Sequence, residues 1–185
     1  MTLLASAFLL QSFTVNTPIS DGEMVVKSSK IVWKAYKVTG SHEGTVDLKS
    51  GSLTFDGDKL TGGSFEIDMT TIACTDLEGD YKGKLEGHLK SDDFFGVANH
   101  TTSSLEVTKV MSTGKNSYDV TGNLTIKGIT SPIDFQVSIY GNKATANLKV
   151  DRTKHDIKYG SGSFFDDLKD NVIYDEFDLV IDLEF

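Results

Sequence analysis

The chain has 185 residues, of which 38% are hydrophobic, 24% charged and 10% aromatic, the usual range of a single globular domain. A formal net charge of −9 and an isoelectric point near 4.8 argue against nucleic-acid binding, because no local stripe of basic residues offsets the acidic surface. The single cysteine, Cys74, excludes an internal disulfide bond.

The first element along the chain is an apolar N-terminal segment, residues 1–22. Residues 2–10 resemble the apolar part of a secretory signal peptide, but no Lys or Arg precedes them. A truncated signal peptide would place the protein in the periplasm or outside the cell. The alternatives are an arm packed on the folded domain or on a second subunit, and an apolar first strand of a cytoplasmic protein. No other stretch approaches the roughly 18 apolar residues of a membrane-spanning helix, so stable membrane insertion is not expected.

Residues 23–185 are predicted to form one domain dominated by β-strands. Apolar and polar residues alternate along the strands. The alternation is clearest at the end of the chain, where Phe177, Leu179 and Ile181 share one parity and Asp178 and Asp182 share the other. Alternation of this kind predicts eight strands, near 24–38, 42–56, 59–72, 102–111, 116–126, 132–140, 143–152 and 172–185. The apolar parity changes around Gly51, which predicts a bulge or a sharp bend. The short connections suit antiparallel hairpins.

Two stretches interrupt the strand pattern. Residues 76–91 carry Leu77, Tyr81, Leu85 and Leu89 at spacings of three and four, which predicts a short helix with Asp76 as its N-cap. Residues 156–170 are rich in glycine and serine, and we expect a loop there with about one helical turn. Both stretches lie between strands that could meet at one end of a barrel.

An eight-stranded antiparallel sheet closes into a barrel that either fills itself with side chains or admits one slender ligand. Small residues at inward positions, namely Ala35, Ala144 and Ala146, favour a cavity. The 11 Phe, 6 Tyr and 1 Trp side chains are numerous enough to fill the core instead. The residue pattern alone leaves both interpretations open.

Five blocks of sequence resemble the YceI-like family, in the family's order. They are Gly40-Ser41-His42-Glu43-Gly44-Thr45-Val46, Phe65-Glu66-Ile67-Asp68-Met69, Lys84-Leu85-Glu86-Gly87-His88-Leu89-Lys90-Ser91-Asp92-Asp93-Phe94-Phe95, Gly122-Asn123-Leu124-Thr125-Ile126-Lys127-Gly128-Ile129-Thr130 and Asp151-Arg152-Thr153. The third block is similar to the family's G-H-L-K-S-x-D-F-F signature. The resemblance implies a bacterial, lipocalin-like, eight-stranded antiparallel β-barrel that encloses a long amphiphile such as a polyisoprenoid. Because family members are often dimers, it also implies a homodimer.

Strand parity and the resemblance together predict which residues line the cavity. The strand residues expected to point inward are Phe65, Ile67, Met69, Phe135, Val137, Leu179 and Ile181. The residues expected near the ligand or at the mouth of the barrel are Trp33, Leu89, Phe94, Phe95, Phe164 and Phe165.

Three polar residues are candidates for binding the head group of the ligand. Arg152 is the single arginine of the chain, and a guanidinium can hold an anionic head through two parallel hydrogen bonds. Its alternative role is a structural ion pair with Asp151, Asp156 or another acid. His88 and His42 are the other candidates, and for each of them the alternative is a hydrogen-bonded packing role.

Neither a metal site nor a catalytic site is expected. The sequence lacks His-x₃-His and Cys-x₂-Cys spacings, and it lacks a Gly-x-Ser-x-Gly elbow, a phosphate loop and a dinucleotide fingerprint. We therefore expect no cofactor other than a bound lipid. The leading hypothesis is a non-enzymatic carrier of a polyisoprenoid, an isoprenoid quinone or a related lipid. The alternatives are a filled-barrel structural or stress-response protein that acts through surface contacts, and a lipid-modifying enzyme.

Overall fold

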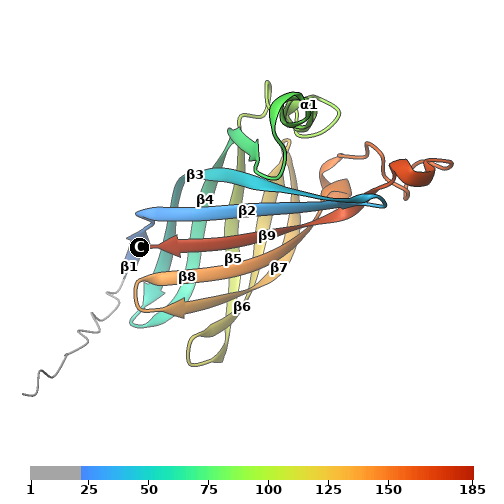
Figure 1. Cartoon of the computed structure of the whole chain (residues 1–185). Coiled ribbons are helices and arrows are strands. Elements are labelled where there is room, and N and C mark those ends of the chain that lie inside the picture. The colour runs from blue at the N-terminus through green and yellow to red at the C-terminus, as the bar shows by residue number, and fades with distance from the viewer. Residues whose placement is uncertain (1–21) are drawn as a thin grey trace, which may run out of the picture.

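The computed structural model describes residues 22–185, so the predicted apolar segment 1–22 lies outside the described residues except for Gly22. Within residues 22–185, nine β-strands surround one interior and one α-helix lies at an end of it (Figure 1). The elements are β1 (Gly22–Val25), β2 (Ser28–Lys37), β3 (Gly40–Asp56), β4 (Lys59–Cys74), α1 (Gly79–Lys90), β5 (Thr102–Gly114), β6 (Ser117–Ile126), β7 (Ile129–Tyr140), β8 (Lys143–Asp151), the 3₁₀ helices η1 (Arg152–His155) and η2 (Lys169–Asn171), and β9 (Ile173–Glu184).

Strands β2 to β9 form a closed antiparallel barrel in which each strand pairs with its neighbours in sequence. The last strand, β9, returns to pair with β2 and thereby closes the ring. Closure leaves no unpaired edge among these eight strands, which protects their backbone groups from pairing with other chains. The predicted eight-stranded antiparallel barrel is confirmed, with β1 as one additional short strand.

The additional strand arises because the predicted segment 24–38 divides into two strands. β1 pairs with residues 52–55 of β3, whereas β2 pairs with residues 40–46 of the same strand. Between them, the amide of Val26 donates to the carbonyl of Gly51 at 2.9 Å, and the amide of Lys27 donates to the carbonyl of Glu184 at 2.7 Å. The prediction of one continuous strand was wrong, because alternation of side chains carries no information about the partner of each residue.

The long strand β3 contains a β-bulge beside Gly51, as the change of parity predicted. Lys49 is the extra residue, since β4 has no residue opposite it between Ile67 and Glu66. Gly51 is also required by close packing, because a Cβ atom there would lie 2.6 Å from Cδ1 of Phe65. The bulge lets β3 curve around the barrel and reverses which residues face inward.

Helix α1 starts later than the sequence predicted. Its N-cap is Glu78, which makes no side-chain capping hydrogen bond. Asp76, the predicted cap, instead accepts a hydrogen bond from the Cys74 thiol at 2.9 Å and lies 3.0 Å from Nδ1 of His42. The carboxylate therefore connects the start of β3 to the end of β4, which is a contact between distant parts of the sequence.

Helix α1 covers the end of the barrel at which β4, β6 and β8 finish, called here the helix end (Figure 1). Leu89 is buried and Leu85 is half-buried against the barrel, whereas Tyr81 is 75% exposed and does not belong to the packed face. Residues 156–168 form a loop, as predicted, and with η1 and η2 they also follow a strand that finishes at the helix end. The β3–β4, β5–β6 and β7–β8 hairpins form the opposite end, called here the far end.

Candidate functional site

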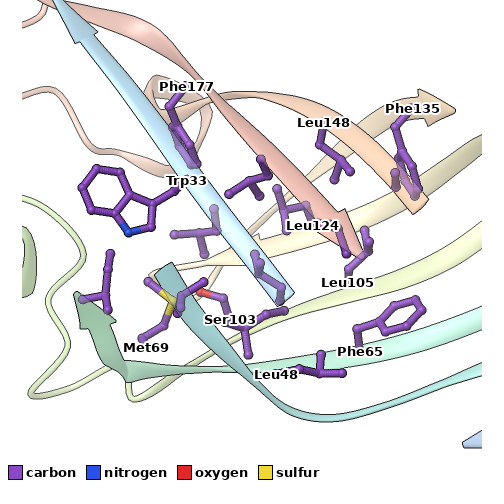
Figure 2. A pocket seen from close by; sticks show the side chains of 18 of the residues that line it. Trp33, Leu48, Phe65, Met69, Ser103, Leu105, Leu124, Phe135, Leu148 and Phe177 are labelled. Carbon is purple, nitrogen blue, oxygen red and sulfur yellow. The ribbon is translucent and has the colours of Figure 1, made fainter. Parts of the chain in front are cut away.

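The interior of the barrel contains an apolar cavity of about 140 Å³, counted as the space that the centre of a water molecule can reach. This is room for roughly ten water-sized spheres. The lining side chains are apolar apart from Ser103, Thr145, Arg152 and Tyr174. Figure 2 shows aliphatic and aromatic side chains converging on this space from strands all around the barrel. A space of this kind repels ions and strongly polar groups and accepts hydrocarbon.

Most of the residues predicted for the cavity do line it. They are Trp33, Phe65, Ile67, Met69, Leu89, Phe94, Phe95, Phe135, Val137, Leu179 and Ile181. The two exceptions are Phe164 and Phe165, which lie in the loop after η1, are each 50% exposed and do not line the cavity. Their placement in the cavity was wrong because the amides of both residues bond to the carbonyl of Ser161 in a surface turn, and Lys158 lies 5.2 Å from the Phe164 ring.

Several lining residues were not predicted, although the same alternation could have found them. Leu105, Leu124, Leu148 and Phe177 occupy inward positions on four different strands. The small residues expected to leave space do line the cavity, namely Ala35, Ala144 and Ala146. Small side chains on β2 and β8 therefore account for part of the space that larger ones would have filled.

The far end of the barrel is closed by aromatic side chains. Phe55 and Phe185 are buried with ring centroids 5.5 Å apart, and neither lines the cavity. Tyr118 packs in the same cluster and its hydroxyl donates to the carbonyl of Asp58 at 3.4 Å. These residues form a floor, and Leu60 is among the lining residues that pack on it.

At the helix end, aromatic residues form a lid over the cavity. Phe94 and Phe95 lie in the turn after α1 with ring centroids 5.3 Å apart, and Phe95 lies 6.4 Å from Phe177 of β9. Trp33 on β2 is buried, and its indole N–H donates to the carbonyl of Thr45 at 3.2 Å. The lid therefore joins the signature segment 84–95 to the barrel wall.

Arg152 is 2% exposed and lies at the helix end. The N–H groups of its guanidinium donate hydrogen bonds to backbone carbonyls of the same chain. Nε donates to the carbonyl of Tyr174 at 3.0 Å, Nη1 to that of Ile157 at 2.8 Å and Nη2 to that of Ile173 at 2.9 Å. A carboxylate oxygen of Asp175 lies 3.6 Å from Nη2. The guanidinium thus ties η1 and the following loop to the start of β9.

The charge of Arg152 is compensated inside the protein. Burial lowers the pKa of the guanidinium and the nearby carboxylates of Asp175 and Asp151 oppose this effect, so the group stays charged. The ion-pair partner is Asp175, which falls under the other acids that the sequence analysis allowed beside Asp151 and Asp156. The Asp151 side chain caps η1, and Asp156 pairs with Lys158 at 2.6 Å. The structural role that the sequence analysis left open for Arg152 is the one that these contacts support.

The structure places His88 behind the lid and not in the cavity lining. Its ring contacts Tyr159 and Phe94 edge to face, with centroid distances of 4.5 and 5.5 Å. Its Nε2 atom is buried and has no hydrogen-bond partner among residues 22–185. His88 therefore supports Phe94 by packing, and a head group in the cavity would reach it only if the lid moved.

The structure also places His42 outside the cavity lining, in the cluster with Asp76 and Cys74. Burial and the hydrogen bond to Asp76 raise the pKa of the Cys74 thiol, which is fully buried. Burial acts to raise the pKa of Asp76, but hydrogen bonds from Cys74 and His42 outweigh it and lower that pKa. A fully buried thiol with a raised pKa is a poor nucleophile.

The sequence analysis missed three polar lining residues, Ser103, Thr145 and Tyr174, and of these Ser103 on β5 is the buried one. It is 6% exposed, it lies opposite Ile67 of β4, and its hydroxyl oxygen lies in the cavity near Met69 (Figure 2). The oxygen has no hydrogen-bond partner among residues 22–185. No motif marks this position, although Ser103 and Leu105 share the inward parity of the strand.

Among residues 22–185, no three side chains of His, Cys, Asp or Glu lie close enough together to hold a metal ion. Helices of the length and hydropathy needed to cross a bilayer are also absent from these residues.

The fold and its cavity define a class of protein, the closed antiparallel β-barrels with an apolar interior beneath a helical lid. The YceI-like domain matches residues 23–185, and the chain belongs to the YceI-like family. The family resemblance seen in the five sequence blocks is thereby confirmed.

Curated relatives match over part of their length. A UPF0312 protein of Azotobacter vinelandii is 37% identical over 90 residues, which are 49% of this chain and 45% of that protein. The UPF0312 protein PA0423 of Pseudomonas aeruginosa is 32% identical over 91 residues, again 49% of this chain and 45% of the relative. The chain therefore spans about half the length of these relatives.

Solved structures show the same fold at low sequence identity. BcnA of Burkholderia cenocepacia has a TM-score of 0.66 at 22% identity, with 84% of this chain and 94% of that chain covered. A polyisoprenoid-binding domain of Saccharophagus degradans, implicated in plant cell wall breakdown, has a TM-score of 0.61 at 16% identity, with coverage of 89% and 99%. The YceI protein of Campylobacter jejuni has a TM-score of 0.55 at 16% identity, with coverage of 100% and 96%.

Proposed function

We propose that the protein is a binding and carrier protein that encloses one long-chain amphiphile, such as a polyisoprenoid, an isoprenoid quinone or a related lipid. The observation that carries the proposal is the apolar cavity between the lid at Trp33 and Phe94 and the floor at Phe55 and Phe185. Protein interiors are normally packed without voids of this size, so an apolar space maintained along a barrel suits a hydrocarbon chain. Membership of the YceI-like family supports the same role.

Before it binds, such a ligand resides in a membrane and not in water. At roughly 0.8 kcal/mol per buried CH₂, moving about 40 carbons out of water would release on the order of 30 kcal/mol, beyond the ceiling of about 20 kcal/mol for non-covalent complexes. The tail of a lipid in a bilayer is already out of contact with water, so the free energy of its transfer into the cavity is close to zero. Selectivity then depends on the length of the cavity and on contacts with the polar group of the ligand.

The charges around the cavity favour an uncharged amphiphile. Arg152 is the lining residue with a formal charge, and its guanidinium is committed to three carbonyl groups and to Asp175. A phosphate or carboxylate head would have to compete with these partners inside a protein of net charge −9. We therefore assign Arg152 the task of holding the helix end together.

We also propose a periplasmic or secreted location and a homodimeric state for this protein. The apolar segment at residues 1–22 supports a periplasmic or secreted location, and the family resemblance supports a homodimer. A binding role fits better than catalysis, because the cavity wall offers no nucleophile beyond the hydroxyl groups of Ser103, Thr145 and Tyr174.

A fluorescence titration tests the proposal, because Trp33 is the single tryptophan of the chain and lines the cavity. The probe is a long-chain alcohol with two bromine atoms at mid-chain, which quench tryptophan fluorescence on contact, delivered from phosphatidylcholine vesicles. We expect saturable quenching at one probe per chain, reversed by the unbrominated alcohol. Quenching that does not saturate, or that the unbrominated alcohol does not reverse, would show that the barrel does not take up such a chain.

A further inference from the structure

Ser103 carries a hydroxyl group beneath the lid, in the otherwise apolar wall of the cavity. The residue is more than nine-tenths buried, and its Oγ atom has no hydrogen-bond partner among residues 22–185. A buried hydroxyl without a partner costs on the order of 1–3 kcal/mol, whereas an alanine of nearly the same size would carry no such cost. Folding alone gives no reason for a serine at this position of an apolar wall.

The position of Ser103 matches the place where the polar end of an enclosed amphiphile would lie. β5 starts at the helix end, and Ser103 is its second residue, so the hydroxyl lies just inside the lid. Next to it are Met69 and Ile67 of β4, and deeper along β5 comes Leu105 (Figure 2). A chain that starts at Ser103 has only apolar side chains between it and the floor, apart from Thr145, whose residue is exposed on the outer face of β8.

The surroundings of Ser103 also restrict the chemistry of the group it can bind. An ionised head placed there would be removed from water among aliphatic side chains, and the charged lining residue, Arg152, is already engaged with three carbonyls and Asp175. One serine hydroxyl can donate one hydrogen bond and accept others, which suits a hydroxyl, carbonyl or amide group.

We propose that Ser103 is the specificity-determining residue of the cavity and forms a hydrogen bond to an uncharged oxygen- or nitrogen-bearing group of the bound amphiphile, with the apolar chain extending from it toward the floor. The inference rests on the proposed carrier function. It deepens that function by naming the ligand class as neutral amphiphiles with a single polar terminus, held inside the barrel and not at its surface.

The test compares two brominated probes of equal chain length, a primary alcohol and the alkane that lacks the hydroxyl, by quenching of Trp33. In Ser103→Ala we expect the affinity for the alcohol to fall by roughly 5- to 100-fold, because its buried hydroxyl loses its partner, while the affinity for the alkane stays the same. Ser103→Thr keeps the hydroxyl and restores the preference for the alcohol. Ser104→Ala makes the same chemical change at the adjacent, exposed residue of β5 and leaves both affinities unchanged.

The stability of the ligand-free protein gives a second readout. A serine that is kept for binding leaves Ser103→Ala as stable as the parent protein or more stable, whereas a structural serine would make that variant less stable. If Ser103→Ala binds both probes as the parent protein does, the assignment of Ser103 is wrong while the carrier function stands. If the parent protein binds neither probe, the carrier function fails and the assignment fails with it.

Discussion

The guanidinium of Arg152 is an example of a buried charge that holds segments of the chain together. Its three hydrogen bonds reach the carbonyls of Ile157, Ile173 and Tyr174, two of which belong to β9 and one to the loop after η1. Removing the guanidinium is costly, because three carbonyls and the half-buried charge of Asp175 lose their partner. The sequence indicated that the single arginine was important, but its partners lie in parts of the chain that local spacing does not connect.

The variant Arg152→Lys tests the structural role of this guanidinium. A lysine keeps the charge but cannot reach three carbonyls with a planar fork, so we expect the free energy of unfolding to fall by about 2–3 kcal/mol. Because the helix end loosens as a whole, affinities for an anionic and a neutral amphiphile of equal chain length are expected to fall together. Chemical denaturation and the two affinities measure this, with Lys154→Arg on the exposed side of η1 as the control. A loss of affinity for the anionic amphiphile alone would show that Arg152 binds the head group.

We expect the carboxylate of Asp175 to make the stability of the fold sensitive to acid. Burial acts to raise its pKa, but hydrogen bonds from Ser161 and Ser163 and the charge of Arg152 outweigh it, so the pKa lies below the ordinary value of 3.8. A carboxyl group whose pKa is lower in the folded state stabilises the fold in full at pH values above its unfolded-state pKa. That contribution is lost as the pH falls through its folded-state pKa.

The variant that tests this is Asp175→Asn. We expect it to be less stable than the parent protein near neutral pH, and the difference to shrink as the pH falls below about 4. Melting temperatures between pH 7 and pH 2 measure it, and Asp170→Asn on exposed η2 serves as the control. A difference that stays constant over this range would show that the charge of Asp175 does not contribute.

At the scale of elements, the parity of β4 decides which side chains face the cavity. Ile67 lines the cavity, whereas Ser64 on the same strand is exposed. We expect Ile67→Glu to lower the free energy of unfolding by at least about 3 kcal/mol and to abolish quenching by the brominated alcohol. Ser64→Glu introduces the same charge on the outer face and is expected to change neither property. Equal behaviour of the two variants would mean that β4 is shifted by one residue.

The elements that were predicted correctly depend on local patterns, and the errors depend on distant contacts. Alternation located the strands, and the change of parity at Gly51 located the bulge of β3. The division of segment 24–38 could not be predicted, because it follows from pairing with residues 52–55 and with β9. The start of α1 was misplaced because Asp76 binds Cys74 and His42 instead of capping the helix.

At the scale of the whole molecule, closure of the barrel explains why most of the cavity could be predicted without coordinates. In a closed sheet with one interior, every inward-facing strand residue lines the core or the cavity, so parity alone places Phe65, Phe135 and Leu179. Parity says nothing about loops, which is why Phe164 and Phe165 were expected near the ligand although they lie exposed on the surface. Whether the interior is hollow also depends on the summed volumes of all inward side chains.

We propose that this hollow holds a lipid, and mass spectrometry of an organic extract of the purified protein tests that claim. The claim predicts one long-chain neutral amphiphile per chain. In Ala146→Phe the new ring points into the cavity between Val137 and Ile181, and the lipid is expected to be lost. In Asn147→Phe, at an exposed neighbouring position of β8, the lipid is expected to remain. An extract without a long-chain lipid, or a lipid retained equally by both variants, would contradict the claim.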